Sequence, residues 1–130
     1  MRVNRSSLLL AGLLLFAHGC TAMHGVGKNL QVTNRPGYFE LHWERLETHS
    51  TELTYDWSSA GSSVALQQTS RIEGGTAKLE IQDASGATVH SEDLGREGSL
   101  TTISGKSGTW RISLKLRSAT GAIGLRLQGA

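Results

Sequence analysis

The chain has 130 residues, a formal net charge of +2 and a single cysteine. This length allows one domain with one hydrophobic core, and a lone cysteine excludes an internal disulfide. The small net charge excludes a nucleic-acid partner, because such a protein needs a surplus of cations to displace counterions.

The first twenty residues predict export. Arg2 and Arg5 precede an apolar run over residues 8–17, and small residues follow it. A membrane-spanning helix needs about 20 apolar residues, whereas a signal peptide has a shorter apolar run with this arrangement of charge. We therefore predict a signal peptide over residues 1–19. Without its two arginines, the mature chain has 11 cationic and 11 acidic side chains and a net charge near zero.

The sequence Ala-His-Gly-Cys at residues 17–20 resembles the lipobox of bacterial lipoproteins. Gly19 and Cys20 match that pattern, whereas Ala17 stands where leucine is usual. The resemblance implies that Cys20 begins the mature chain and carries a lipid, so the partner is the membrane, reached through this anchor. For a source with two membranes, Thr21 in place of aspartate implies the periplasmic face of the outer membrane. An ordinary secretory cleavage before Cys20 stays open, because Ala17 and Gly19 also form a small-x-small site.

Residues 20–37 are predicted as the lipidated N-terminus and a tether, with a short strand near Leu30 and Val32. Over residues 38–130, apolar and polar side chains alternate with a period of two. This alternation indicates antiparallel strands, each with one buried and one solvated face. The expected buried positions are Phe39, Leu41, Trp43, Leu53, Tyr55, Trp57, Val64, Leu66, Ala77, Leu79, Ile81, Trp110, Ile112, Leu114, Leu116, Ile123, Leu125 and Leu127.

About eight short strands separated by turn signals predict an all-β domain over residues 38–130. The expected architecture is a single small antiparallel β-sandwich, with a small closed β-barrel as the alternative. The turn signal at residues 118–121 predicts a hairpin with a four-residue loop. In this register Leu116 lies opposite Ile123, which keeps both apolar rows on one face.

A second hairpin is predicted at the Asp-Ala-Ser-Gly turn of residues 83–86. A three-residue loop with Gly86 at positive φ would place Ile81 opposite Val89. This turn, followed by Gly-Thr-Trp at residues 108–110, is similar to pre-peptidase C-terminal and GOLD-like domains. The similarity implies an accessory module for binding or assembly, because those families share no catalytic residues.

Four cations share the outward face of the last predicted hairpin: Arg111, Lys115, Arg117 and Arg126. This candidate binding face would suit an anionic lipid, an envelope glycan or a partner protein. The alternative is a solubilising face that keeps the sheet from aggregating. Trp57 precedes a loop and is a candidate aromatic platform for a sugar ring, with core packing as its alternative.

No catalytic or metal-binding motif is present. The five histidines have neither H-x-H nor H-x-x-x-H spacing, and no serine lies in a G-x-S-x-G or S-x-x-K motif with a plausible base. We therefore predict no cofactor, no metal and no enzymatic activity. The leading hypothesis is a membrane-anchored envelope lipoprotein that acts as a non-catalytic binding or assembly module. A carbohydrate- or peptidoglycan-binding β-sandwich is one alternative, and a hydrolase or metal-dependent enzyme is another.

Overall fold

A computed structural model describes residues 29–59 and 61–129 of the chain. The described residues form seven strands: β1 (Leu30–Arg35), β2 (Tyr38–Ser59), β3 (Ser63–Gln68), β4 (Arg71–Gln82), β5 (Thr88–Asp93), β6 (Ser99–Ser104) and β7 (Gly108–Gly129). β1 is the short strand expected near Leu30 and Val32, so the sheet includes part of the predicted tether. The predicted leader and Cys20 lie outside the described residues. Within these residues, no helix has the length and apolar character needed to cross a membrane.

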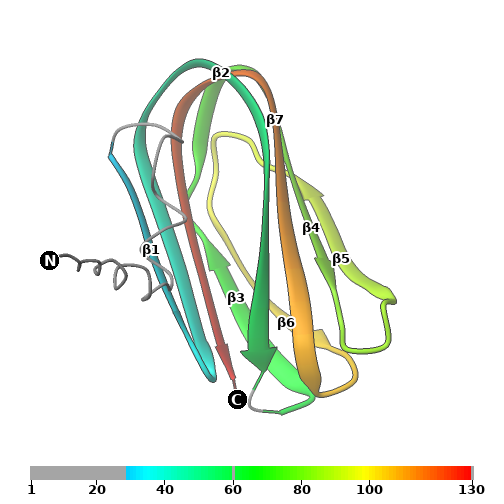
Figure 1. Cartoon of the computed structure of the whole chain (residues 1–130). Coiled ribbons are helices and arrows are strands. Elements are labelled where there is room, and N and C mark those ends of the chain that lie inside the picture. The colour runs from blue at the N-terminus through cyan, green and yellow to red at the C-terminus, as the bar shows by residue number, and fades with distance from the viewer. Residues whose placement is uncertain (1–28, 60, 130) are drawn as a thin grey trace, which may run out of the picture.

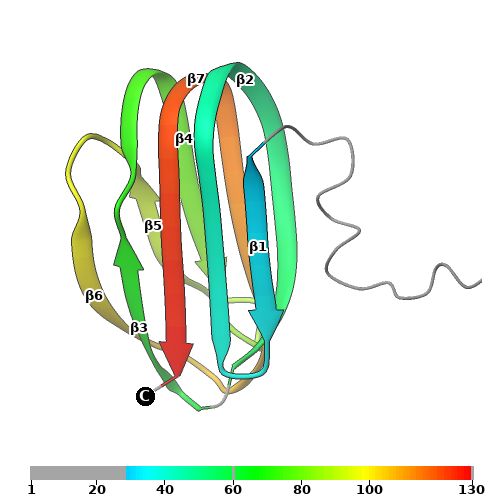
Figure 2. The ribbon, with the colours of Figure 1, turned by 90° about the vertical axis from the view of Figure 1, so that its left-hand side faces the viewer.

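The two longest strands, β2 and β7, pass through both layers of the molecule and pair with each other in each layer (Figures 1 and 2). The front sheet contains β1, the first part of β2, the last part of β7, β3 and β6. The back sheet contains the second part of β2, the first part of β7, β4 and β5. β1, β5 and β6 each have one hydrogen-bonded neighbour, so the described sheets stay open. The predicted β-sandwich is therefore confirmed over the closed barrel.

Both long strands bend where they pass from one sheet to the other. The register of β2 against β7 is interrupted between Trp43 and Thr51. Thr48 and Ser118 have positive φ angles of 49° and 47°, and Gly121 has a φ of 136°. Such local departures from extended backbone let a strand turn a corner and join a second layer.

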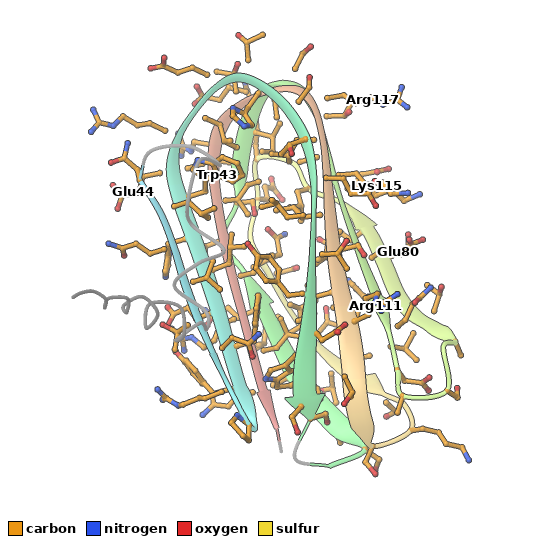
Figure 3. All side chains as sticks on the ribbon, in the orientation of Figure 1. Trp43, Glu44, Glu80, Arg111, Lys115 and Arg117 are labelled. Carbon is orange, nitrogen blue, oxygen red and sulfur yellow. The ribbon has the colours of Figure 1, made fainter. Side chains whose placement is uncertain are left out.

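The apolar faces of the two sheets meet to form the core. The largest fully buried side chains are those of Trp43, Trp57, Trp110, Phe39, Leu41, Leu66, Leu79, Ile81, Ile112, Leu114, Leu125 and Leu127. Phe39 of the front sheet contacts Tyr55 of the back sheet, with ring centroids 5.3 Å apart. In Figure 3 the exposed side chains lie outside the two layers, as the period-two alternation predicts.

The hairpin predicted at residues 118–121 is wrong. These residues belong to the continuous strand β7, and Leu116 pairs with Thr51 of β2 and Ala77 of β4 rather than with Ile123. Ile123 pairs with Trp43 in the other sheet. The two apolar rows face the core from opposite layers, which satisfies the same alternation without a hairpin. β2 likewise joins two expected segments, so the described residues from Tyr38 onward form six strands rather than about eight, and β1 before them is the seventh.

The turn between β4 and β5 has the predicted three-residue loop, but the predicted register is wrong. The Asp83 amide donates to the Ala87 carbonyl at 2.9 Å, and Gly86 has a φ of 89°. Ile81 nevertheless pairs with His90, because the register shifts by one residue between Ile81 and Gln82. The shift is a β-bulge, in which an extra residue enters one strand only.

Candidate functional site

The candidate binding face from the sequence is divided between the two sheets. Arg111, Lys115 and Arg117 follow the outward face of β7 in the back sheet (Figure 3). Arg126 lies beyond the bend, on the outward face of the front sheet, where it pairs with Glu40 of β2. The prediction that all four cations share one face is therefore wrong, because it depended on the hairpin that β7 replaces.

Trp57 is not an aromatic platform. Its side chain is 0% exposed, and its indole Nε1 donates to the Arg35 carbonyl oxygen at 3.1 Å. It packs edge-to-face against Trp110, with ring centroids 6.1 Å apart. The alternation of β2 continues to Ser59 and places Trp57 in the core, so the alternative interpretation, core packing, is confirmed for this residue.

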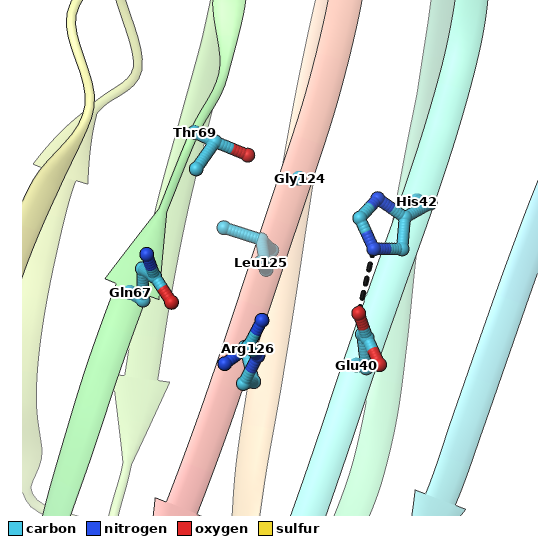
Figure 4. Close-up of a pocket in the computed structure, with 7 residues that line it drawn as sticks. All are labelled: Glu40, His42, Gln67, Thr69, Gly124, Leu125 and Arg126. Atoms are coloured by element: carbon cyan, nitrogen blue, oxygen red, sulfur yellow. Dashed lines mark hydrogen bonds and ion pairs between the residues drawn. The ribbon is translucent and has the colours of Figure 1, made fainter.

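An open hollow on the outward face of the front sheet is lined by residues of β2, β3 and β7 and by Thr69, which follows β3 (Figure 4). We call it the front groove, and its lining residues are Glu40, His42, Gln67, Thr69, Gly124, Leu125 and Arg126. Its volume is about 110 Å³. Gly124 creates the space, since a Cβ at this position would lie 2.3 Å from the Thr69 hydroxyl oxygen.

Glu40 is held as a carboxylate by two neighbours on its own strand. The Tyr38 hydroxyl donates to Glu40 Oε1 at 2.5 Å, and His42 Nε2 lies 2.6 Å from Glu40 Oε2. An ionised carboxylate only accepts hydrogen bonds, so the imidazole nitrogen is the donor. These hydrogen bonds, that from Tyr38 first, lower the pKa of Glu40, and the Tyr38 contact raises the pKa of Tyr38. The groove therefore contains a fixed, negatively charged acceptor.

Three other polar groups of the front groove have no protein partner among the described residues. No hydrogen bond or ion pair within this part of the chain uses the Gln67 amide, the Thr69 hydroxyl or the Arg126 guanidinium. Gln67 and Thr69 can both donate and accept, and Arg126 only donates. Leu100, 75% exposed, pairs with Gln67 and adds an apolar edge. The groove thus offers mixed hydrogen-bonding groups to a ligand.

A second hollow lies on the outward face of the back sheet. We call it the cationic hollow, and its lining residues are Thr76, Lys78, Asp93, Lys115 and Arg117. Its volume is about 330 Å³. Arg111, farther along β7, lies outside it and makes an ion pair with Asp56 at 3.3 Å.

The Asp83 turn at the end of the sandwich is a structural feature. Asp83 Oδ1 accepts from the Ser85 hydroxyl and amide, and Oδ2 accepts from the Lys106 amide at 2.9 Å. These hydrogen bonds, that from the Ser85 hydroxyl first, lower the pKa of Asp83 to about 2. The carboxylate therefore joins the β4–β5 turn to the β6–β7 connection and is not available to a ligand.

The described residues contain no group of three His, Cys, Asp or Glu side chains that could hold a metal ion. His90 instead makes a 2.9 Å contact with Glu92, whose other oxygen accepts from the buried Gln68 amide at 3.0 Å. Gln68 also donates to the Glu97 carbonyl and accepts from the Ser70 amide. This network connects the two sheets at their open edge, so its residues have structural partners already.

Of the residues that line the front groove, only Arg126 was predicted as a site residue; Glu40, His42, Gln67, Thr69 and Gly124 were not. In the sequence, each of these is a polar residue or a glycine with nothing to distinguish it from its neighbours. They come together only because β3 pairs with β7 and β7 pairs with β2. The available signal was a glycine on the solvated phase of the last strand, since a glycine within a strand often marks a close approach.

No protein-family model and no curated protein matches the chain. Solved structures do match, and several are carbohydrate-binding modules. One is from Cellvibrio mixtus lichenase 5A in complex with cellotriose, with 13% identity over 79% of this chain and 88% of that chain and a TM-score of 0.45. Another, in complex with β-1,4-galactotriose, has 17% identity over 78% and 81% of the two chains and a TM-score of 0.46.

A third match is a carbohydrate-binding domain of a multidomain xylanase from the hindgut metagenome of Trinervitermes trinervoides, with 16% identity. It covers 80% of this chain and 88% of that chain, with a TM-score of 0.42. At these values the likeness is one of general β architecture only. The similarity to pre-peptidase C-terminal and GOLD-like domains stays a prediction.

Proposed function

We propose that this chain is a non-catalytic binding module of the cell envelope that holds a glycan in the front groove. One observation carries the proposal: the groove places a fixed carboxylate, an imidazole, an amide, a hydroxyl and a guanidinium around the space above Gly124. A sugar hydroxyl both donates and accepts, so a mixed set of donors and acceptors suits it. The exposed Leu100 beside Gln67 offers an apolar contact for the C–H groups of a ring.

The charge of the groove favours a neutral glycan over an ionic ligand. Glu40 and Arg126 are Cα partners on adjacent strands and bring one negative and one positive charge. An anion would meet the Glu40 carboxylate, and a cation would meet the Arg126 guanidinium. A polyhydroxylated neutral molecule can use both groups at once, because each offers hydrogen bonds in a fixed direction.

The groove is suited to binding and not to cleavage. Glycoside hydrolysis ordinarily needs two carboxyl groups, one of which is protonated to act as a general acid. Among the described residues, Glu40 is the only acid that lines the front groove, and hydrogen bonds lower its pKa. A carboxylate held in this ionised state is a poor proton donor near neutral pH.

Gly124→Ser is expected to weaken glycan binding about tenfold or more, because its side chain occupies the groove and displaces one ligand hydroxyl with its hydrogen bonds. The fold should tolerate the change, since the only close atom is the rotatable Thr69 hydroxyl and the φ of Gly124 lies outside the range that favours glycine. The measurement is calorimetric titration of the protein with neutral oligosaccharides.

Gly95→Ser is the matched control, because nothing lies within 4 Å of the Cβ it would add. Its affinity should equal that of the unchanged protein. Equal affinities for both variants, or no binding to any oligosaccharide in the unchanged protein, would refute the front groove as a glycan site.

The envelope location is the second part of the proposal, and it is supported by the predicted leader and by the lipobox resemblance at Cys20. We expect protein isolated from its native host to begin at Cys20 and to carry a diacylglycerol on sulfur. Mass spectrometry of the intact protein measures both features, with Cys20→Ser as the control that cannot be acylated on sulfur. An intact chain from Met1 in the cytosol would contradict this location and would leave the glycan test unaffected.

A further inference from the structure

The cationic hollow brings three positive side chains together without an ion pair. Lys78 of β4 and Lys115 of β7 are direct Cα partners, and Arg117 is the next outward residue along β7. None of the three lies within 4.0 Å of a carboxylate among the described residues. Lys115 and Arg117 lie together near the upper part of β7 in Figure 3.

This arrangement costs stability in the unliganded protein. Like charges placed directly opposite on neighbouring strands repel each other and weaken the sheet. Elsewhere on β7 a cation is neutralised by an acid on the neighbouring strand: Arg111 has Asp56 opposite it on β2, and the two make an ion pair. In the hollow, by contrast, Lys78 and Lys115 have Asp93 and Glu52 as partners on the outer strands but make no ion pair with them among the described residues, so their ammonium groups can contact a negatively charged ligand.

Acids border the hollow, but none of them makes an ion pair with its three cations among the described residues. Asp93 lines the hollow and is the Cα partner of Lys78, and Glu52 is the partner of Lys115 on β2. Glu80 lies two residues beyond Lys78, on the same outward face of β4. Inside the hollow itself, three cations face one carboxylate, and the Thr76 hydroxyl adds a hydrogen-bond donor.

We propose that the cationic hollow binds a phosphate group. Two ammonium groups, a guanidinium and a hydroxyl are the donors that phosphate oxygens accept from, and arginine adds the planar pair of N–H groups that matches two oxygens at once. The hollow lies on the opposite face of the sandwich from the front groove, so the two sites can be filled together. A phosphate that belongs to a membrane lipid would direct the front groove away from that membrane.

The test uses the full chain carrying Cys20→Ser, so that no acyl group on sulfur contributes to binding. Titration with inorganic phosphate, followed by amide NMR shifts, should give saturable shifts confined to the strands around Lys78 and Lys115. Lys115→Thr should weaken this binding about tenfold, through loss of a charge-assisted contact. Lys106→Ser, which removes one positive charge elsewhere, should change it by less than about twofold.

Two further measurements separate binding from a structural role. Asp93→Asn should strengthen phosphate binding several-fold, because it removes the one negative charge in the hollow. Lys115→Thr should raise the melting temperature in phosphate-free buffer by about 2 °C, since it ends the repulsion with Lys78 and adds a β-branched residue to a strand. A purely structural lysine would show the reverse, with lower stability on substitution.

Vesicles identify the source of the phosphate. Binding to phosphatidylglycerol vesicles but not to phosphatidylcholine vesicles, and its loss in Lys115→Thr, would assign the hollow to an anionic lipid headgroup. Phosphate-dependent shifts with no Lys115-dependent binding to either vesicle would assign it to a soluble phosphate. The proposal fails if inorganic phosphate shifts no amide around the hollow, or if Lys115→Thr and Lys106→Ser lower the affinity equally.

Discussion

Gly121→Ala is expected to destabilise the protein by more than about 3 kcal/mol, which is a large part of the stability of a domain this size. Gly121 lies where β7 passes from the back sheet to the front sheet, and its φ of 136° is a conformation that side chains rarely adopt. An added Cβ would lie 2.0 Å from the Arg71 carbonyl oxygen. That oxygen belongs to the backbone of β4, so no rotation of a side chain can relieve the clash.

Urea denaturation of Gly121→Ala and of Gly95→Ala measures this effect. Gly95 has neither a positive φ nor any atom within 4 Å of a new Cβ, so Gly95→Ala should change the free energy of unfolding by about 0.5 kcal/mol or less. Gly75→Ala should behave like Gly121→Ala, because its Cβ would lie 2.0 Å from the Ser118 carbonyl oxygen on the same bend. A Gly121→Ala protein as stable as the Gly95→Ala control would mean that β7 does not cross between the sheets at this point.

The period-two alternation predicts which side chains form the core, because burial decides the face of each strand whatever its partner is. Phe39, Leu41, Trp110 and Leu127 are all buried as the pattern requires. Leu53 is only partly buried, since it lies on the part of β2 that forms the edge of the back sheet. The β-sandwich itself follows from the same pattern, because two such faces have to cover each other.

The alternation could not distinguish a hairpin from a strand that changes sheets. Both arrangements place Leu116 and Ile123 on buried faces, and both need a bend with small or polar residues between them. The sequence Ser-Ala-Thr-Gly at 118–121 suits either bend, because Ser118 and Gly121 supply the positive φ angles. The choice depends on β2, which makes the matching bend beside β7 and pairs with it on both sides.

The front groove could not be predicted from the sequence, because its residues lie on strands that are far apart in the chain and become neighbours only in the folded sheet. Glu40 and His42 come from β2, Arg126 comes from β7, and Gln67 comes from β3. A single strand shows only that these side chains face solvent. The predicted candidate binding face was wrong for a related reason. It included Lys115 and Arg117 correctly, but β4 is the neighbour of this part of β7, so Lys78 lies beside Lys115 where Arg126 was expected.

Trp57→Ala is expected to lower the free energy of unfolding by about 3–5 kcal/mol, the usual cost of removing a large aromatic side chain from a core. Trp57 is fully buried against Trp110, and its indole holds the Arg35 carbonyl at the end of β1. The Gly37 amide donates to the Ser58 carbonyl at 2.9 Å beside it, so Trp57 also helps to fix the β1–β2 turn against the back sheet.

Trp57→Phe separates the packing of Trp57 from its hydrogen bond. Phenylalanine keeps much of the apolar volume but leaves the Arg35 carbonyl without the indole donor, which costs about 1–3 kcal/mol. Chemical denaturation should therefore show a lower free energy of unfolding for Trp57→Ala than for Trp57→Phe. At temperatures where Trp57→Phe stays folded, its affinity for a glycan in the front groove should be unchanged, because no atom of Trp57 lines that groove. A sugar-stacking tryptophan would give the opposite pair of results, with lost affinity and little change in stability.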